Sequence, residues 1–287
     1  MSKPGMFWRR INGGEKNDSL ICGLCPHGCV LNSGVCGLCN KRRNMGGELV
    51  SESYGQISSM ALDPIEKKPL HMFYPGAMIL SIGSLGCNFR CQFCQNHEIA
   101  MGHVRYEVMT PEQITNLAQE TVSHGNIGVA YTYNEPLIGY EFVYDCSRLI
   151  RDAGLKNVIV TNGFINQEPL EALLPCIDAM NIDLKGFTDK FYKKINGNLE
   201  SVKNTIALAS DSCHVEVTTL VIPGENEEDV EPIARWLAGI NPSIPLHLSR
   251  FFPRHQYEDR EATSRDVIIK SAESARKHLK HVFTGNM

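Results

Sequence analysis

The stretch from residue 78 to residue 96 reads MILSIGSLGCNFRCQFCQN and joins a short apolar run to three closely spaced cysteines. The run 78–82 predicts a buried strand. Cys87, Cys91 and Cys94 follow this strand with C-x3-C-x2-C spacing. That spacing is typical of metal ligands, so it predicts a metal centre on the loop that leaves the strand.

The absence of a fourth cysteine from this loop is informative. Iron–sulfur cubanes usually take four cysteine ligands, so three thiolates leave one iron open to a ligand from outside the protein. A structural zinc site needs four protein ligands, and a zinc loop or three incidental buried thiols are therefore the weaker interpretations. An open iron predicts chemistry at the cluster.

These residues resemble the signature of the radical S-adenosylmethionine (radical SAM) superfamily. The resemblance implies a [4Fe-4S] cluster whose open iron binds the amino and carboxylate groups of the methionine moiety of S-adenosylmethionine. It implies that this cofactor is cleaved by one electron to methionine and a 5'-deoxyadenosyl radical, which abstracts a hydrogen atom. It also implies that Phe93, just before the last cysteine of the motif, lies beside the adenine.

Composition narrows the class of protein. A chain of 287 residues, of which 43% are hydrophobic, suits one barrel-sized domain with a small appendage. The net charge of -4 and the scattered basic residues give no reason to expect nucleic-acid binding. No run of about 18 apolar residues predicts a membrane span. Eleven cysteines, an odd number, without an apolar signal segment in residues 1–16 favour a reduced, cytoplasmic protein. An open iron would be oxygen-sensitive, so we expect an anaerobic or microaerobic setting.

A second group of cysteines lies near the N-terminus, where residues 22–39 read CGLCPHGCVLNSGVCGLC. Two C-x2-C pairs among glycines predict two turns that converge on one metal, which would supply most of the folding energy of so small a module. Five cysteines and His27 exceed the four ligands that a metal needs. We predict as ligands Cys22, Cys25, Cys29 and Cys36, with Cys39 spare or alternate. Zinc and a second iron–sulfur cluster both fit the spacing, and unmetallated thiols are the remaining alternative.

Residues 63–76, DPIEKKPLHMFYPG, contain three prolines and predict an extended connector. Together with the segment CPHGC, this stretch is similar to the radical SAM component of the AmmeMemoRadiSam system, a branch similar to pyruvate formate-lyase activating enzymes. The resemblance covers about residues 20–286. We therefore divide the chain into a Cys-rich module at 1–62, a connector at 63–77 and a core at 78–287.

Beyond the cysteine loop, apolar runs alternate with helix-like stretches. The predicted strands are 78–83, 127–133, 157–161, 178–184, 214–222 and 244–250. The predicted helices are 111–124, 137–153, 167–176, 198–210, 227–239 and 264–280. Six β-α repeats predict an α/β fold with a parallel sheet, and a partial (β/α)6 TIM-like barrel agrees with the fold that the resemblance implies. The resemblance also implies a closing strand at 281–286.

In a barrel of this type the site lies at the C-terminal ends of the strands. The resemblance implies that Glu135 pairs with the methionine amino group, although Tyr133 and Asn134 stand where relatives carry two glycines. It implies that Asp183 approaches the ribose and Lys185 the methionine carboxylate, with a structural ion pair as the alternative. The remaining residues predicted at the cofactor site are Tyr133, Asn134, Thr161, Asn162, Val221 and Pro223.

The resemblance implies a radical SAM enzyme. No residue stands out as an acid, a base or a nucleophile, and hydrogen-atom abstraction does not require one. The substrate is open. The resemblance implies either a glycyl radical installed on a partner glycyl radical enzyme or a target shared with AMMECR1-like and Memo-like proteins. An external one-electron donor, such as flavodoxin or ferredoxin, would be needed. The alternatives are a zinc-binding module and an iron–sulfur scaffold or electron-transfer protein without radical chemistry.

Overall fold

The computed structural model describes residues 2–11 and 18–287 and is built around one eight-stranded sheet. The spatial order of the strands is β16-β15-β14-β13-β12-β11-β9-β8. All pairings are parallel except that of β8 with β9. The strands are β8 (Ser59–Pro64), β9 (Met78–Gly83), β11 (Asn126–Tyr131), β12 (Lys156–Thr161), β13 (Ala179–Asp183), β14 (His214–Val221), β15 (Leu246–Arg250) and β16 (Val282–Gly285). Because β8 and β16 do not pair, the sheet is an open, partial barrel.

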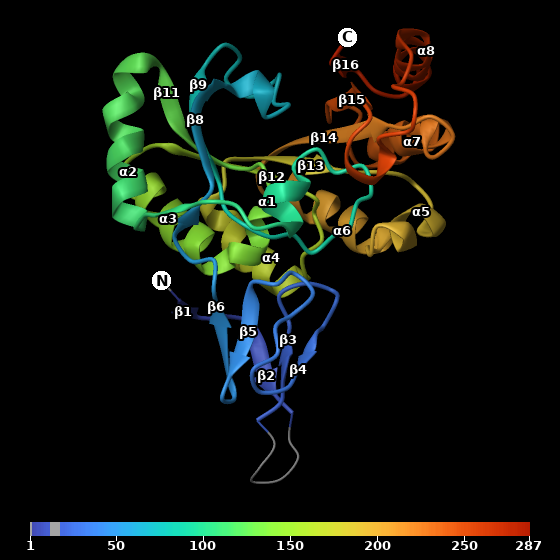
Figure 1. Cartoon of the computed structure of the whole chain (residues 1–287). Coiled ribbons are helices and arrows are strands. Elements are labelled where there is room, and N and C mark those ends of the chain that lie inside the picture. Colours follow the sequence, from blue (N-terminus) through green and yellow to red (C-terminus); the bar gives the residue numbers. More distant parts are fainter. Residues whose placement is uncertain (1, 12–17) are drawn as a thin grey trace.

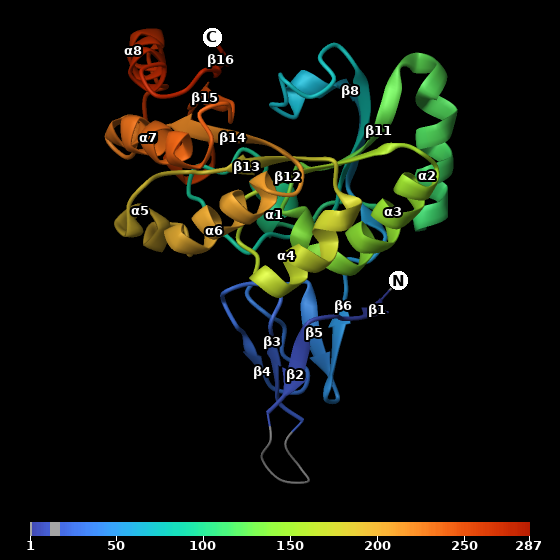
Figure 2. The ribbon, with the colours of Figure 1, turned by 180° about the vertical axis from the view of Figure 1, so that it is seen from behind.

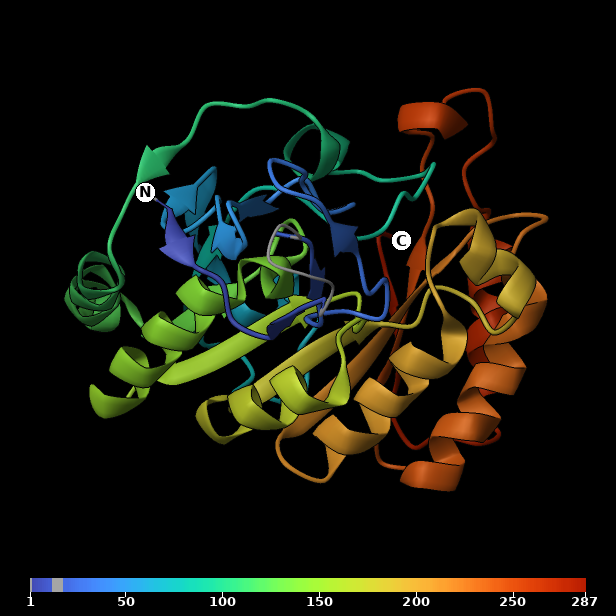
Figure 3. The same ribbon diagram turned by 90° about the horizontal axis from the view of Figure 1, so that it is seen from below.

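Helices cover the outer face of the sheet, so the strands between them are buried on both faces (Figure 3). The middle strands β12 and β13 show this burial clearly, since Val158, Ile159 and Met180 have no exposed surface. The helices are α1 (His97–Met101), α2 (Pro111–Glu120), α3 (Tyr140–Asp152), α4 (Gln167–Leu173), α5 (Asp189–Lys194), α6 (Leu199–Ser210), α7 (Val230–Ile240) and α8 (Arg265–Ala275).

Local sequence signals set where several of these helices begin. Thr110 caps α2: its hydroxyl accepts from the backbone N–H of Gln113, whose side chain accepts in return from the N–H of Thr110, and Pro111 follows at the first helical position. Asn198 caps α6 and Ser264 caps α8 through a single bond each, in which the side chain accepts from the backbone N–H three residues further on. These caps fix where the loops end that leave the C-terminal ends of the strands.

The N-terminal segment forms small antiparallel sheets that project from the barrel below α3 and α4 in Figures 1 and 2. One contains β1 (Lys3–Pro4), β5 (Arg42–Met45) and β6 (Glu48–Ser51), and another contains β2 (Trp8–Arg10), β3 (Leu20–Cys22) and β4 (Val30–Leu31). A third pairs β7 (Gln56–Ile57) with β10 (Glu107–Val108). A buried ion pair attaches the projection to α3, because the Arg42 guanidinium donates to both carboxylate oxygens of Glu141, at 2.8 and 2.9 Å.

The connector folds back onto the barrel. Glu216 on β14 is fully buried and accepts hydrogen bonds from the backbone N–H groups of His71 and Met72, at 3.0 and 2.8 Å. Its carboxylate also lies 2.9 Å from the His214 ring and 2.6 Å from the His247 ring. Burial opposes the charge, but the four hydrogen bonds lower the pKa of Glu216 to about 2. The connector is therefore held to the barrel wall by one ionised carboxylate.

The structure confirms the α/β class and the parallel sheet, and it adds elements that the sequence pattern did not predict. The predicted strands coincide with β9 and β11 to β15 to within about two residues, and β16 occupies the position of the closing strand. The antiparallel strand β8 and the short helices α1 and α5 were not predicted. Among the helices described, none is long and apolar enough to cross a bilayer.

Candidate active site

A cavity of about 620 Å3 opens at the C-terminal ends of the strands. It is bounded by the cysteine loop on one side, by polar residues that follow β11, β12 and β13, and by the connector. The sequence-predicted residues that line it are Cys87, Cys91, Phe93, Cys94, Tyr133, Asn134, Glu135, Thr161, Asn162, Asp183 and Lys185. The fold thus brings together groups from four segments that are up to about a hundred positions apart in the chain.

The cysteine loop leaves β9 through Gly86, whose φ of 93° only glycine adopts easily. Any side chain at Gly86 would also lie within 3 Å of Lys41, Ile138 and the backbone of Cys39. The loop then presents the Cys87 sulfur to two donors, the Phe89 N–H at 3.4 Å and the Asn162 amide at 3.8 Å. Donors of this kind favour a thiolate bound to a metal.

Burial governs the acidity of these thiols. It raises the pKa of Cys91 to about 12 and raises the pKa of Cys87 and Cys94 as well. Buried thiols would therefore stay protonated at neutral pH, unless a metal replaces the protons. The donor set and its environment fit a metal centre that three thiolates share.

Glu135 is a buried polar group of the site, at 2% exposure. It accepts from the Thr161 hydroxyl at 2.7 Å and from the backbone N–H groups of Asn162 and Leu137, at 2.8 and 3.0 Å. Burial is the largest influence on its pKa, which rises to about 7 despite these hydrogen bonds. A cationic partner in the cavity would therefore stabilise the ionised carboxylate and lower its pKa.

Asp183 and Lys185 form an ion pair at the end of β13, with a separation of 2.8 Å. The two side chains leave the strand on the same side, as strand alternation requires. Burial opposes the charge of Lys185, but Asp183 and the nearby thiols raise the pKa of the ammonium above its ordinary value. Both charges act on the neighbouring thiols: Lys185 lowers the pKa of Cys91 and Cys94, and Asp183 raises it.

Val221 and Pro223 lie outside the lining of the cavity, whereas Leu220, Thr218 and Ser249 lie within it. On β14, Thr218 and Leu220 point inward by the period of two, so Val221 points the other way into the core, where it is fully buried. The connector residues Lys68 and His71 also line the cavity. Both belong to the connector predicted at 63–77, and the sequence signal that could have indicated their place is that the connector directly precedes the cysteine strand.

The four N-terminal cysteines that lie together in the structure are not the four predicted as ligands. Cys22, Cys25, Cys29 and Cys39 line one small cavity, but Cys36 does not. The Cys36 thiol instead donates to the backbone carbonyl of Arg42 at 3.3 Å. Within residues 2–11 and 18–287, no group of three or more His, Cys, Asp or Glu side chains is arranged to hold a single metal ion.

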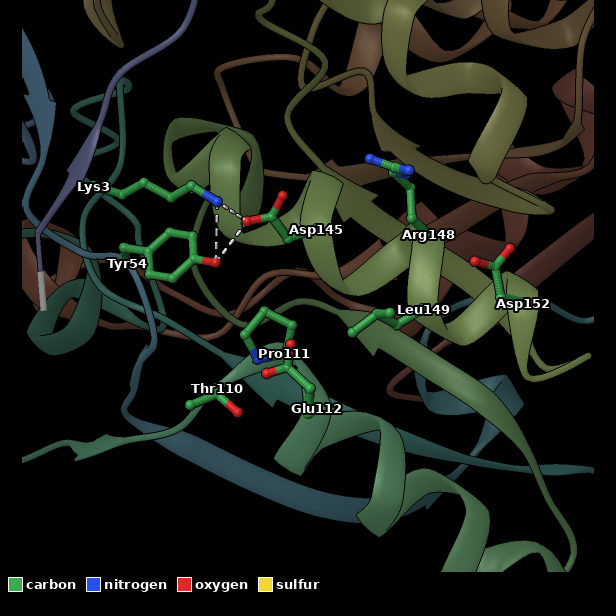
Figure 4. A pocket seen from close by; sticks show the side chains of 9 residues that line it. All are labelled: Lys3, Tyr54, Thr110, Pro111, Glu112, Asp145, Arg148, Leu149 and Asp152. Carbon is green, nitrogen blue, oxygen red and sulfur yellow. Dashed lines mark hydrogen bonds and ion pairs between the residues drawn. The ribbon is translucent and has the colours of Figure 1, made fainter.

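A separate hollow of about 460 Å3 lies between β1, α2 and α3 (Figure 4). The Tyr54 hydroxyl donates to Asp145 at 2.6 Å, and the Lys3 ammonium forms an ion pair with the same carboxylate. Arg148 and Asp152 lie along α3, away from these three residues (Figure 4). These contacts hold β1 against α3, and we assign the hollow a structural role.

Comparison with known proteins agrees with this geometry. The sequence model of the radical SAM superfamily matches residues 81–237, which is more than half of the chain. The chain is 39% identical to an uncharacterized protein of Methanocaldococcus jannaschii over 294 residues, which cover 99% of this chain and 85% of that protein.

Two further proteins are similar to this chain, one in the sequence of half of the chain and one in fold. The pyruvate formate-lyase 1-activating enzyme of Escherichia coli is 27% identical over 154 residues, covering 50% of this chain and 61% of the enzyme. A radical SAM methyltransferase from Sphaerobacter thermophilus has a similar fold, with a TM-score of 0.57 and 16% identity over 74% of this chain and 67% of the methyltransferase. The chain belongs to the radical SAM superfamily and is similar, within it, to the pyruvate formate-lyase activating enzymes.

Proposed function

We propose that the chain binds a [4Fe-4S] cluster on Cys87, Cys91 and Cys94 and uses it to cleave S-adenosylmethionine reductively. Membership of the family implies both groups. When bound, the cluster supplies the electron for a cleavage that yields methionine and a 5'-deoxyadenosyl radical, which takes a hydrogen atom from the substrate. The observation that carries the proposal is that three loop thiols and the polar strand-end residues open onto one cavity.

The residues around the cavity have complementary charges for a zwitterionic cofactor. Lys185 is suited to bind the methionine carboxylate, and its partner Asp183 is suited to accept a hydrogen bond from the ribose. Glu135 is suited to bind the amino group, because its carboxylate already faces the cavity and lacks a cationic partner among the contacts of the described residues. Asn134 lines the cavity and is bonded to the backbone of Ser84 and Gly86, so it also supports the loop.

Apolar side chains are suited to shield the radical from water. Phe93 is 5% exposed and packs near Phe191 and Tyr257, with ring centroids 6.1 and 5.9 Å away. Leu220 and Val160 also line the cavity. These positions favour contact with the adenine and the ribose, and Leu220 is the neighbour of Val221 that faces the cavity.

The test uses the full chain, reconstituted anaerobically because an open iron is oxygen-sensitive. We expect reduction to give an electron paramagnetic resonance signal that shifts when S-adenosylmethionine is added, and 5'-deoxyadenosine to accumulate. Cys91→Ala should abolish both results, whereas Cys213→Ala, a cysteine between α6 and β14, should preserve them. A reducible cluster with no response to the cofactor would favour an electron-transfer protein and overturn the proposal.

For the substrate we propose a glycine of a partner glycyl radical enzyme, which similarity to the E. coli activating enzyme supports. A flavodoxin or ferredoxin would supply the electron, in an oxygen-poor cytoplasm. The proposed AmmeMemoRadiSam branch adds AMMECR1-like and Memo-like proteins as partners. A doublet typical of a glycyl radical, formed only when this chain, cofactor and candidate partner are mixed, would support the first target; a product formed only with the AMMECR1-like and Memo-like proteins would support the second.

A further inference from the structure

The second cysteine group contains a set of four thiols that face one another. Cys22, Cys25, Cys29 and Cys39 line an enclosed cavity whose other walls include Leu24 and Ile138. Cys22 and Cys29 belong to adjacent chain segments, since the N–H of Cys22 donates to the carbonyl of Cys29 at 3.0 Å. Four thiolates are the complement that an iron–sulfur cluster without an open iron requires.

An unpartnered buried donor points to an acceptor that belongs in this cavity. Arg42 lines the cavity and is 2% exposed. Its terminal nitrogens are occupied by Glu141 and by the carbonyl of Met6, but its Nε finds no hydrogen-bond acceptor. The Cys22 sulfur lies within hydrogen-bonding reach of the guanidinium, so as a thiolate it is the nearest candidate acceptor. Because a buried N–H without an acceptor is costly, a thiolate or cluster sulfide beside Arg42 would complete its bonding.

Backbone donors in the module repeat the pattern of the catalytic loop. The backbone N–H groups of His27 and Lys41, each two residues further on, stabilise the thiolate forms of Cys25 and Cys39 and so oppose the rise in pKa that burial causes. Cys87 accepts from the N–H of Phe89 with the same offset. Such donors lower the charge density on a metal-bound thiolate, so both sets of cysteines are prepared for the same kind of ligand.

Four thiols suit a [4Fe-4S] cluster, in which each thiolate binds a different iron, and they also suit a single zinc ion. We choose the cluster because contacts join the module to the catalytic loop, where a redox-active group can serve that loop and a zinc ion cannot.

Asn88 contacts both cysteine sites. This residue lines the module cavity, its carbonyl lies 2.8 Å from the His27 ring, and its side-chain oxygen accepts from Asn162 in the active site at 2.8 Å. The Arg90 guanidinium donates to the carbonyl of Leu38 in the module. The module is thus bonded directly to the loop that follows Cys87.

We propose that Cys22, Cys25, Cys29 and Cys39 hold a second [4Fe-4S] cluster, with Cys36 outside it. The site lies behind the catalytic loop, where it accepts one electron from a flavodoxin or ferredoxin and passes that electron on to the cluster of Cys87, Cys91 and Cys94. The ligand set is independent of the proposed function, and only the relay role rests on it.

The test isolates the module inside the full chain. In a triple variant, Cys87→Ala with Cys91→Ala and Cys94→Ala, anaerobic reconstitution should leave about four irons and four sulfides per chain, with a resonance signal that does not respond to S-adenosylmethionine. Adding Cys39→Ser should remove this iron, whereas adding Cys36→Ser, the matched control, should retain it. Circular dichroism checks that each variant is folded.

Several outcomes would overturn the proposal. They are a folded triple variant without iron, loss of iron through Cys36→Ser, retention of iron in Cys39→Ser, and one zinc in place of iron. For the relay, Cys39→Ser should slow cofactor cleavage driven by flavodoxin several-fold more than cleavage driven by titanium(III) citrate; an equal decrease would overturn that role. A wild-type chain with about eight irons and no response to the cofactor would instead contradict the proposed function alone.

Discussion

Asp183 and Lys185 illustrate how single residues prepare the cavity. Each is a costly charge to bury, and each offsets the cost for the other across 2.8 Å. Because they are two positions apart at the end of β13, the sequence pattern placed them on one side of the strand. The same alternation predicts that Leu220 and Val221 on β14 face opposite sides, and Leu220 is the one that lines the cavity. The resemblance named Val221 by its position in the motif, which does not say which way its side chain points.

Lys185→Met should weaken binding of S-adenosylmethionine about 10- to 100-fold, because a charge-assisted hydrogen bond to the carboxylate would be lost. Equilibrium binding to the anaerobically reconstituted chain measures the effect. Lys203→Met, which removes a lysine paired with Glu200 on the outer helix α6, serves as the control and should bind normally. Equal affinity of the two variants would assign the Asp183 pair a structural role only.

The five N-terminal cysteines show where residue-level prediction stops. Spacing indicated a metal site and an excess ligand, and it placed Cys36 in the set with Cys39 as spare. In the structure the Cys36 thiol donates a hydrogen bond to the carbonyl of Arg42. Cys39 lines one cavity together with Cys22, Cys25 and Cys29. Spacing alone cannot separate the two members of a C-x2-C pair when a turn decides which thiol points inward.

At the scale of elements, parallel strands were predictable because burial on both faces leaves continuous apolar runs. The edge strand β8 was not predictable in this way. Most side chains of Ser59–Pro64 are half-exposed, buried and exposed positions do not alternate along it, and it ends in proline. Its pairing with β9 nevertheless fixes where the connector begins. The connector itself depends on Glu216, which lies about 140 positions away in the sequence, so no local pattern could reveal the contact.

Glu216→Gln should destabilise the fold by about 3 kcal/mol, because an amide cannot accept all four hydrogen bonds that the buried carboxylate accepts. Urea unfolding followed by circular dichroism at pH 7.5 gives the free energy. The control Glu200→Gln changes a carboxylate on α6 that is 65% exposed and should leave stability unchanged. A neutral effect of Glu216→Gln would mean that the connector is held by other contacts.

At the scale of the whole molecule, the module and the barrel are joined by buried contacts rather than by a linker. The Arg42–Glu141 pair is 2% and 1% exposed, and Glu141 also accepts from the N–H of Met6 at 2.7 Å. Asn166, at the start of α4, bonds to the carbonyls of Gly23 and Leu24. We therefore expect the two parts to unfold in one transition.

Glu141→Gln should lower the free energy of unfolding by about 3 to 5 kcal/mol, since it leaves the Arg42 charge buried and unpaired. Glu52→Gln is the matched control, because it breaks the neighbouring, half-exposed pair with Arg43 and should cost less than about 1 kcal/mol. Thermal unfolding of both variants measures the difference. Two separate transitions in the wild-type chain would contradict the joint unfolding of module and barrel.

The contacts of the cysteine loop also impose an order of assembly. The loop position of Cys87 depends on two neighbours. Asn162, which follows β12, contacts the Cys87 sulfur, and Asn88, the next residue in the chain, contacts the module. Both contacts form only after distant segments have met, and parallel pairings of this kind close slowly. We expect the newly made chain to fold first and to receive iron afterwards, so that an iron-delivery protein meets a folded acceptor with its thiols already in position.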